Sequence, residues 1–370
     1  MFSRAITRNF TKFKQPLVRA NPLFAQCLPK RNVSLLMNSY GLNEEQTMIQ
    51  EMAYQFAEAE IAPHAAEWDE NKHFPIETFR AAAELGFGGI YVSEDYGGCD
   101  LSRLEASLIF EALATGCPAT SAYLSITNMV AAMMDKYGND AQKAKYLEDI
   151  VSLKRLSCYM LTEPGSGSDA GAMKTTAIDK GDHFLVNGSK CFISGSGVED
   201  NVYLLMCMTA PKEFSVLILE DGMKGLEFSA NEKKMGWNCQ PTRVVTFDDV
   251  KVPKENLLGE RGHGFKYAMA GLDGGRINIA SCSLGGAAKS LELATQYTKE
   301  RKQFGKSISE FQNTQFTLAK MATKLEASRS LLRQAARMVA EGDPNGTMYS
   351  AMAKRYATDE CFDVVNSALQ

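Results

Sequence analysis

The chain has 370 residues, of which 45% are hydrophobic and 23% are charged, values typical of a globular protein of two or three domains. Its 40 basic and 44 acidic side chains give a net charge of −4, whereas nucleic-acid binding favours a basic excess. No apolar run approaches the about 18 residues that a membrane span needs. Nine scattered cysteines without a CxxC pair and four unpaired histidines predict neither a disulfide framework nor a metal site.

The first 43 residues differ in composition from the rest of the chain. They carry seven basic side chains and no acidic one, and Phe2, Ile6, Phe10 and Phe13 would share one face of a helix. This pattern predicts a mitochondrial transit peptide and leader over residues 1–43, and therefore a location in the mitochondrial matrix. A disordered basic tail is the alternative. Residues 44–370 are distinctly acidic, with 33 basic and 44 acidic side chains.

Residues 44–157 have helical periodicity and predict an N-terminal helical domain. Asn43 and Gln46 have the spacing of a capping box ahead of an apolar series. Gly138 is a helix stop signal, and Asp140 is the expected N-cap of the next helix.

Residues 158–262 contain short runs rich in aliphatic, aromatic and β-branched side chains, which are typical of strands. His183–Val186 and Ser189–Ser194 flank Asn187-Gly188, the signal for a type I′ hairpin. This region therefore predicts a middle antiparallel β domain, barrel-like in form.

The helical period returns in residues 263–370, which predict a C-terminal helical bundle. Five apolar residues recur every seven positions and predict a bundle seam: Phe311, Leu318, Leu325, Leu332 and Val339. Asp343-Pro344 is expected to be the N-cap and first residue of a last helix. That helix has no stop signal before Gln370, so we expect the bundle to be incomplete in this chain. The fold class is α+β, multidomain.

Two segments of the β region have unusual composition. Tyr159–Asp169 runs from a strand into a turn with two glycines and two serines, whose N–H groups could hold an anion. An ordinary surface turn is the alternative. Phe192 and Ser194 occupy alternate positions of one strand and hence one face, which is also what an ordinary strand does.

Two segments of the last region also leave alternatives open. Gly274 and Gly275 stand in a helical stretch, where each costs about 1 kcal/mol relative to alanine. Such a cost indicates close approach, either by another helix or by a ligand. Arg301 lies in a basic turn, where it either binds a phosphate or is solvated.

From about residue 44 onward the chain resembles the acyl-CoA dehydrogenases. The helix, sheet and helix plan is that family's plan, and four segments fall in the family's order: Tyr159–Asp169, Phe192–Ser194, Asp273–Arg276 and Arg301–Phe304. Three others are similar to the branch that acts on short branched-chain thioesters: Gly236–Arg243, Gly275–Gly285 and Ala357–Phe362.

The resemblance implies FAD as cofactor and an acyl-CoA as substrate. Thr162 would bond near the flavin ring and Ser194 near its reactive nitrogen. The cofactor-binding residues implied are Tyr159, Met160, Leu161, Thr162, Glu163, Pro164, Gly165, Ser166, Gly167, Ser168, Phe192, Ile193 and Ser194, with Arg301, Phe311 and Gln312 reaching the FAD of a neighbouring subunit and Gln370 opening a further FAD segment. The substrate-binding residues implied are Ser168, Asp273, Gly274, Gly275 and Arg276.

The implied reaction is α,β-dehydrogenation, in which a carboxylate removes the α-proton and the β-hydrogen passes as hydride to the flavin. Electron-transfer flavoprotein would accept the electrons, and the family's homotetramer is implied. In this branch the catalytic glutamate is expected beyond Gln370. Some relatives carry it at the position of Gly275, where a glycine cannot act as base. We therefore expect no catalytic residue within this chain, and no activity from the chain alone.

Three hypotheses follow from the sequence. The first is a dehydrogenase of short branched-chain acyl-CoA that converts isobutyryl-CoA to methacrylyl-CoA in valine catabolism, with 2-methyl-branched or short straight chains as alternative substrates. The second is a truncated, non-catalytic isoform that acts as a binding or dominant-negative subunit. The third is an acyl-CoA oxidase, which the transit-like N-terminus disfavours.

Overall fold

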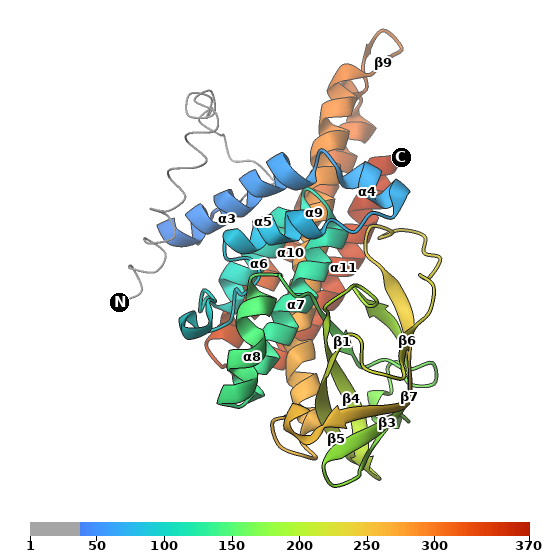
Figure 1. Cartoon of the computed structure of the whole chain (residues 1–370). Helices are drawn as coiled ribbons and strands as arrows, with labels where there is room; N and C mark the ends of the chain where they lie inside the picture. Colours follow the sequence, from blue (N-terminus) through green and yellow to red (C-terminus); the bar gives the residue numbers. More distant parts are fainter. Residues whose placement is uncertain (1–37) are drawn as a thin grey trace, which may run out of the picture.

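The computed structural model describes residues 38–370, in which N-terminal and C-terminal helices pack together and the β domain lies at one end of them (Figure 1). Most of the predicted transit peptide, residues 1–37, lies outside the described residues. The N-terminal helices are α3 (Glu44–Phe56), extended by the π-helical turn η2 (Ala57–Ile61), α4 (Ala65–Asn71), α5 (Ile76–Glu84), α6 (Arg103–Ala114), α7 (Pro118–Tyr137) and α8 (Asp140–Val151).

Side-chain caps fix where several of these helices begin. The predicted capping box of Asn43 and Gln46 is confirmed at α3. Helix α7 ends before Gly138 as predicted. The predicted N-cap Asp140 is wrong by one residue, because the Asn139 side chain accepts from the Gln142 amide at 2.9 Å and caps α8.

The middle domain is a single eight-stranded sheet in the order β6-β7-β3-β2-β4-β5-β8, with β1 paired to β4. Its strands are β1 (Ser157–Met160), β2 (Thr176–Asp179), β3 (His183–Ser194), β4 (Val202–Ala210), β5 (Glu213–Glu220), β6 (Leu226–Phe228), β7 (Thr242–Pro253) and β8 (Leu257–Leu258). The antiparallel prediction holds for most pairs, but β1 and β2 are parallel to β4.

The barrel-like prediction is wrong, because the sheet is open. The end strands β6 and β8 have three and two residues, and within residues 38–370 they do not pair with each other. Both faces of the central strand β4 are nevertheless covered. Leu204 and Met206 pack toward helices α7 and α8, while Tyr203 and Leu205 pack in the core of the β domain. Burial on both faces explains the continuous apolar run of β4.

The predicted hairpin at Asn187-Gly188 is also wrong, because β3 runs straight through these two residues. Gly188 has a φ of +145° at a register shift, so it forms a bulge instead of a turn. Asn187 forms two hydrogen bonds with Asp249 on the neighbouring strand β7, of 2.9 and 3.0 Å. The chain reverses earlier, at Gly181 between β2 and β3.

The C-terminal region consists of α9 (Gly264–Glu300), the short strands β9 (Lys302–Gln303) and β10 (Lys306–Ser307), α10 (Gln312–Ala340) and α11 (Gly346–Leu369). Of the five residues predicted to form the bundle seam, Leu325 and Leu332 of α10 are fully buried. The predicted start of the last helix at Asp343-Pro344 is wrong. The Asp343 carboxylate accepts from the amide of Asn345 at 2.7 Å and forms a turn, so α11 begins at Gly346.

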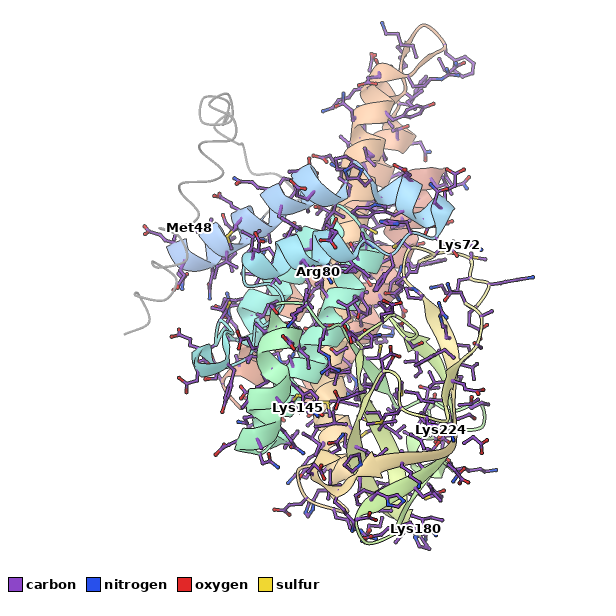
Figure 2. The ribbon with its side chains drawn as sticks, in the orientation of Figure 1. Met48, Lys72, Arg80, Lys145, Lys180 and Lys224 are labelled. Atoms are coloured by element: carbon purple, nitrogen blue, oxygen red, sulfur yellow. The ribbon has the colours of Figure 1, made fainter. Side chains whose placement is uncertain are left out.

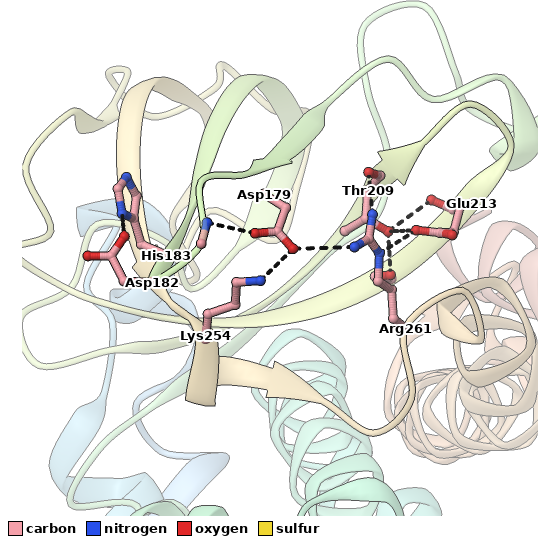
Figure 3. Close-up of polar contacts among 9 residues, drawn as sticks. Asp179, Asp182, His183, Thr209, Glu213, Lys254 and Arg261 are labelled. Atoms are coloured by element: carbon pink, nitrogen blue, oxygen red, sulfur yellow. Dashed lines mark hydrogen bonds and ion pairs between the residues drawn. The ribbon is translucent and has the colours of Figure 1, made fainter.

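One apolar core joins the two helical regions, and polar contacts join both to the sheet. Within the core, Arg329 of α10 donates to the buried carboxylate of Glu111 on α6 at 2.6 Å. Lys145, labelled on α8 in Figure 2, lies 2.7 Å from Glu220 at the end of β5. Arg261, just before α9, contacts Asp179 and Glu213 of the sheet (Figure 3). The Lys145 and Arg261 contacts join α8 and the start of α9 to the β domain.

Across residues 38–370, the structure has no helix that is both long and apolar enough to cross a membrane. The same residues contain no cluster of side chains that could hold a metal ion.

Candidate functional site

The two unusual segments of the β region lie side by side. The backbone amide of Cys191 on β3 donates to the carbonyl of Thr162 at 2.9 Å, which joins Tyr159–Ser168 directly to the strand that carries Phe192 and Ser194. The hydroxyl of Tyr159 donates to the carbonyl of Ala268 at 3.3 Å and ties the first segment to α9. Strand, turn and long helix therefore meet at one place.

A buried ion pair holds this junction together. Lys190 donates to the Glu163 carboxylate at 2.8 Å, and the two side chains are 0% and 6% exposed. The same ammonium group donates to the carbonyl of Leu161 at 2.8 Å. Glu163 also accepts from the backbone amides of Lys174 and Thr175, at 2.6 and 3.1 Å. Every charge of the pair thus has several partners, as a buried pair requires.

The electrostatics of the pair follow from its burial. Burial by itself raises the pKa of the Glu163 carboxyl, but hydrogen bonds from Lys190 and from two backbone amides hold that pKa below its ordinary value. Burial lowers the pKa of Lys190, and the carboxylate offsets this only in part. Glu163 is therefore an internal anchor with its carboxylate fully engaged.

The residues of Tyr159–Ser168 fall into two groups. Met160 and Leu161 place their side chains in the core, so only their backbone can face a ligand. Ser166 donates its hydroxyl to the carbonyl of Asp169 at 2.6 Å. The rest of the turn is open: Pro164, Gly165, Gly167 and Ser168 are exposed, and a Cβ added at either glycine would meet no atom within 4 Å.

Strand β3 is irregular where the second segment lies. Its register shifts between Lys190 and Ile193, and Phe192 has a φ of +60°. Phe192 is 65% exposed, a large fraction for an apolar ring, whereas Ile193 is buried. Ser194 is half-buried and its hydroxyl lies 3.4 Å from the side-chain nitrogen of Gln240. A non-glycine residue in this conformation is strained, which is common at functional sites.

Helix α9 carries the third segment, Asp273–Arg276. The Asp273 carboxylate pairs with Arg276 and accepts from the hydroxyl of Thr347 on α11 at 2.8 Å. The two glycines differ in their surroundings. A Cβ at Gly274 would lie 2.3 Å from the Arg103 guanidinium of α6, whereas at Gly275 it would meet only Met129, at 3.8 Å. Close approach by a neighbouring helix's side chain thus accounts for Gly274.

The remaining predicted residues lie elsewhere in the chain. Arg301 is exposed at the end of α9, and Phe311 and Gln312 begin α10, beside the β9–β10 turn at the tip opposite the β domain (Figure 1). Phe311 contacts Lys306, whose ammonium lies 4.3 Å from the ring centre. Gln370 caps α11. Within one chain, the structure does not bring these residues to Tyr159–Ser168.

Sequence reasoning missed Lys190 and Arg103. The signal for Lys190 was a charged residue at an inward position of an apolar strand. Arg103 gave no signal, because its position depends on how α6 packs against α9.

The family models of the acyl-CoA dehydrogenases match three parts of the chain: the N-terminal domain over residues 43–154, the middle domain over 158–250 and the C-terminal domain over 262–370. The chain belongs to the acyl-CoA dehydrogenase family, whose members are flavoproteins. It is 50% identical over 341 residues to mitochondrial isobutyryl-CoA dehydrogenase of Bos taurus, covering 91% of this chain and 82% of that protein. It is 51% identical over 336 residues to the mitochondrial isobutyryl-CoA dehydrogenase of Dictyostelium discoideum, covering 90% and 80%.

A solved structure agrees with this assignment. The butyryl-CoA dehydrogenase of Megasphaera elsdenii superposes with a TM-score of 0.85 at 38% identity, covering 90% of this chain and 89% of that one. The order of helical, β and helical domains predicted from the sequence is thereby confirmed.

Proposed function

We propose that this protein is the FAD-dependent dehydrogenase of a short branched-chain acyl-CoA, and that isobutyryl-CoA is its substrate. The observation that carries the proposal is the junction of Thr162, Cys191 and the buried Glu163–Lys190 pair, because it fixes two flavin-contacting segments of the family against each other. The identity of about half the sequence to two isobutyryl-CoA dehydrogenases supports the substrate.

The residues at this junction fit a flavin. An exposed aromatic ring at Phe192, open backbone at Gly165 and Gly167, and the hydroxyls of Thr162 and Ser194 suit a flat, partly apolar ring with polar edges. We propose that these residues and the rest of Tyr159–Ser168 and Phe192–Ser194 hold FAD. When bound, FAD supplies the acceptor for the hydride lost by the β-carbon.

Helix α9 and the turn before it are proposed to bind the thioester. Ser168 is exposed and offers a donor, and the space over Gly275 suits an acyl group. Asp273 is engaged by Arg276 and Thr347, so we assign both Asp273 and Arg276 to shaping and orienting this place. Excluding water there strengthens every polar contact that orients the substrate.

The proposed partners follow from the same site and from the relatives. Electron-transfer flavoprotein is the proposed electron acceptor, and the mitochondrial matrix is the proposed location. A homotetramer is supported by the exposed apolar side chains around the β9–β10 turn, namely Leu293, Tyr297, Phe304 and Phe316. In that assembly Arg301, Phe311 and Gln312 would reach the FAD of a neighbouring subunit, and Gln370 is also proposed to contribute to FAD binding.

The test is a titration of the FAD-loaded protein with isobutyryl-CoA, followed by flavin absorption without oxygen. We expect isobutyryl-CoA to change the flavin spectrum and free coenzyme A to change it far less, because the acyl group must lie against the ring. The proposal fails if the protein does not retain FAD, or if isobutyryl-CoA and coenzyme A act alike.

A further inference from the structure

The side chain of Arg103, the first residue of α6, is half-buried and reaches across to helix α9. Its guanidinium carbon is 3.9 Å from the ring centre of Tyr91, within the range of a cation–π contact. On another side it covers Gly274, where a Cβ would lie 2.3 to 2.5 Å from three guanidinium atoms. Only a glycine at position 274 permits this contact.

Within residues 38–370 no ion pair joins the Arg103 guanidinium to a carboxylate. Its Nη1 atom is buried and has no hydrogen-bond partner there. The carboxylate of Glu105, on the same helix, accepts from Gln46 and Ser102 instead. A second orphan is close by: Asn278 accepts from the Tyr91 hydroxyl at 2.8 Å, yet its side-chain nitrogen is buried without a partner. Buried polar groups are nearly always hydrogen-bonded, so two such neighbouring groups call for an explanation.

The two adjacent glycines of α9, Gly274 and Gly275, differ in how much room lies over them. Over Gly275 the nearest atom to an added Cβ is the Met129 sulfur at 3.8 Å, an ordinary contact. One residue earlier, about 100° around the helix, the guanidinium of Arg103 on α6 fills the space over Gly274. An acyl group over Gly275 that extends toward α6 would therefore meet Arg103 as its chain lengthens.

We propose that Arg103, held between Tyr91 and Gly274, is the wall that limits the length of the acyl chain. This inference rests on the proposed function, because it takes Gly274 and Gly275 as part of the thioester site. Arg103 acts by occupying volume, and the Tyr91 ring holds it in place. Its unpaired Nη1 adds a desolvation cost for any methylene that would press against it.

The experiment uses the full-length, FAD-loaded protein and a straight-chain series of butyryl-, hexanoyl- and octanoyl-CoA. Dissociation constants are measured from the change in flavin absorption, so the readout does not depend on turnover. We expect the wild type to bind butyryl-CoA most tightly. In Arg103→Ala the ratio of the hexanoyl to the butyryl dissociation constant should fall about tenfold, since two methylenes gain apolar contact.

Arg103→Met is the matched control, because it removes the charge and keeps a side chain of similar reach. It should keep the wild-type preference for butyryl-CoA within about threefold. If Arg103→Ala does not fold, Arg103→Leu opens part of the same space, and its ratio should fall in the same direction.

The outcomes separate the inference from the function on which it rests. If the ratio of the hexanoyl to the butyryl dissociation constant is unchanged in both the alanine and the leucine variant, Arg103 does not limit the acyl chain. Equal falls in the alanine and methionine variants also overturn the inference, because charge and not volume would then set the preference. If the wild-type protein binds none of these thioesters, the proposed function itself fails and the inference falls with it.

Discussion

Removing the ammonium group of Lys190 is the sharpest perturbation of the junction that joins the two proposed flavin-binding segments. In Lys190→Met the side chain keeps its length and apolar stem but no longer donates to Glu163 or to the carbonyl of Leu161. The carboxylate is then left buried, with only two backbone amides to compensate its charge.

The size of the effect follows from this geometry. Removing one partner of a buried ion pair costs about 3–5 kcal/mol, because the other charge stays uncompensated. Because two backbone amides still donate to Glu163, we expect Lys190→Met to lose about 3 kcal/mol of stability. Proteins are stable by only about 5–15 kcal/mol, so this loss is large. The double variant Lys190→Met with Glu163→Gln leaves no lone charge and should cost about 1–3 kcal/mol, less than the two single variants combined.

Urea unfolding followed by circular dichroism measures these costs, and flavin fluorescence measures FAD affinity in the same variants. Lys180→Met is the control, because Lys180 is exposed at the tip of the β domain (Figure 2) and should change stability by less than about 0.5 kcal/mol. A cost for Lys190→Met as small as that of the control would refute the reasoning. Strictly additive costs in the double variant would refute it too.

The difference in unfolding free energy between Lys190→Met and the wild type should narrow as pH falls from 7 to about 4 in acid-unfolding titrations. In the wild type the pKa of Glu163 is depressed, so the stabilisation from its carboxylate is lost in acid, whereas in the variant burial raises the pKa of the lone carboxyl and protonation removes the cost of its buried charge. An unchanged difference contradicts this. Glu111→Gln should cost about 1.5–3 kcal/mol in urea unfolding, because the buried Arg329 guanidinium loses one charged hydrogen-bond partner while it keeps the Glu326 carboxylate, and a loss under about 0.5 kcal/mol contradicts this. Gly285→Ala should lower the melting temperature, because its Cβ would lie 2.1 Å from a backbone oxygen of α6, whereas Gly275→Ala should leave it equal or higher; the reverse order contradicts the packing.

The succession of domains could be predicted from the sequence because each region has its own periodicity. Leu325 and Leu332 repeat every seven residues and are buried, and the apolar run of β4 matches a strand covered on both faces. Local turn signals were less reliable. Asn187-Gly188 has the composition of a hairpin, but Asp249 on the neighbouring strand holds Asn187 in the sheet and the bulge absorbs Gly188.

The residues of the candidate site were predicted from the resemblance to a family. The contacts that hold those residues in place could not be predicted from it. Glu163 falls within the recognised segment, yet its partner lies 27 residues later in the chain on another strand. Gly274 suggested close approach, but only the packing of α6 against α9 identifies Arg103 as the group that approaches. Both contacts arise between elements distant in sequence, where periodicity carries no information.

The most direct measurement is an experimental structure of the protein with FAD and isobutyryl-CoA bound. We expect the flavin ring between Thr162 and the Phe192–Ser194 segment, with the acyl group over Gly275 and its end against Arg103. A flavin bound elsewhere on the chain, or a thioester away from α9, would contradict the assignment of the site.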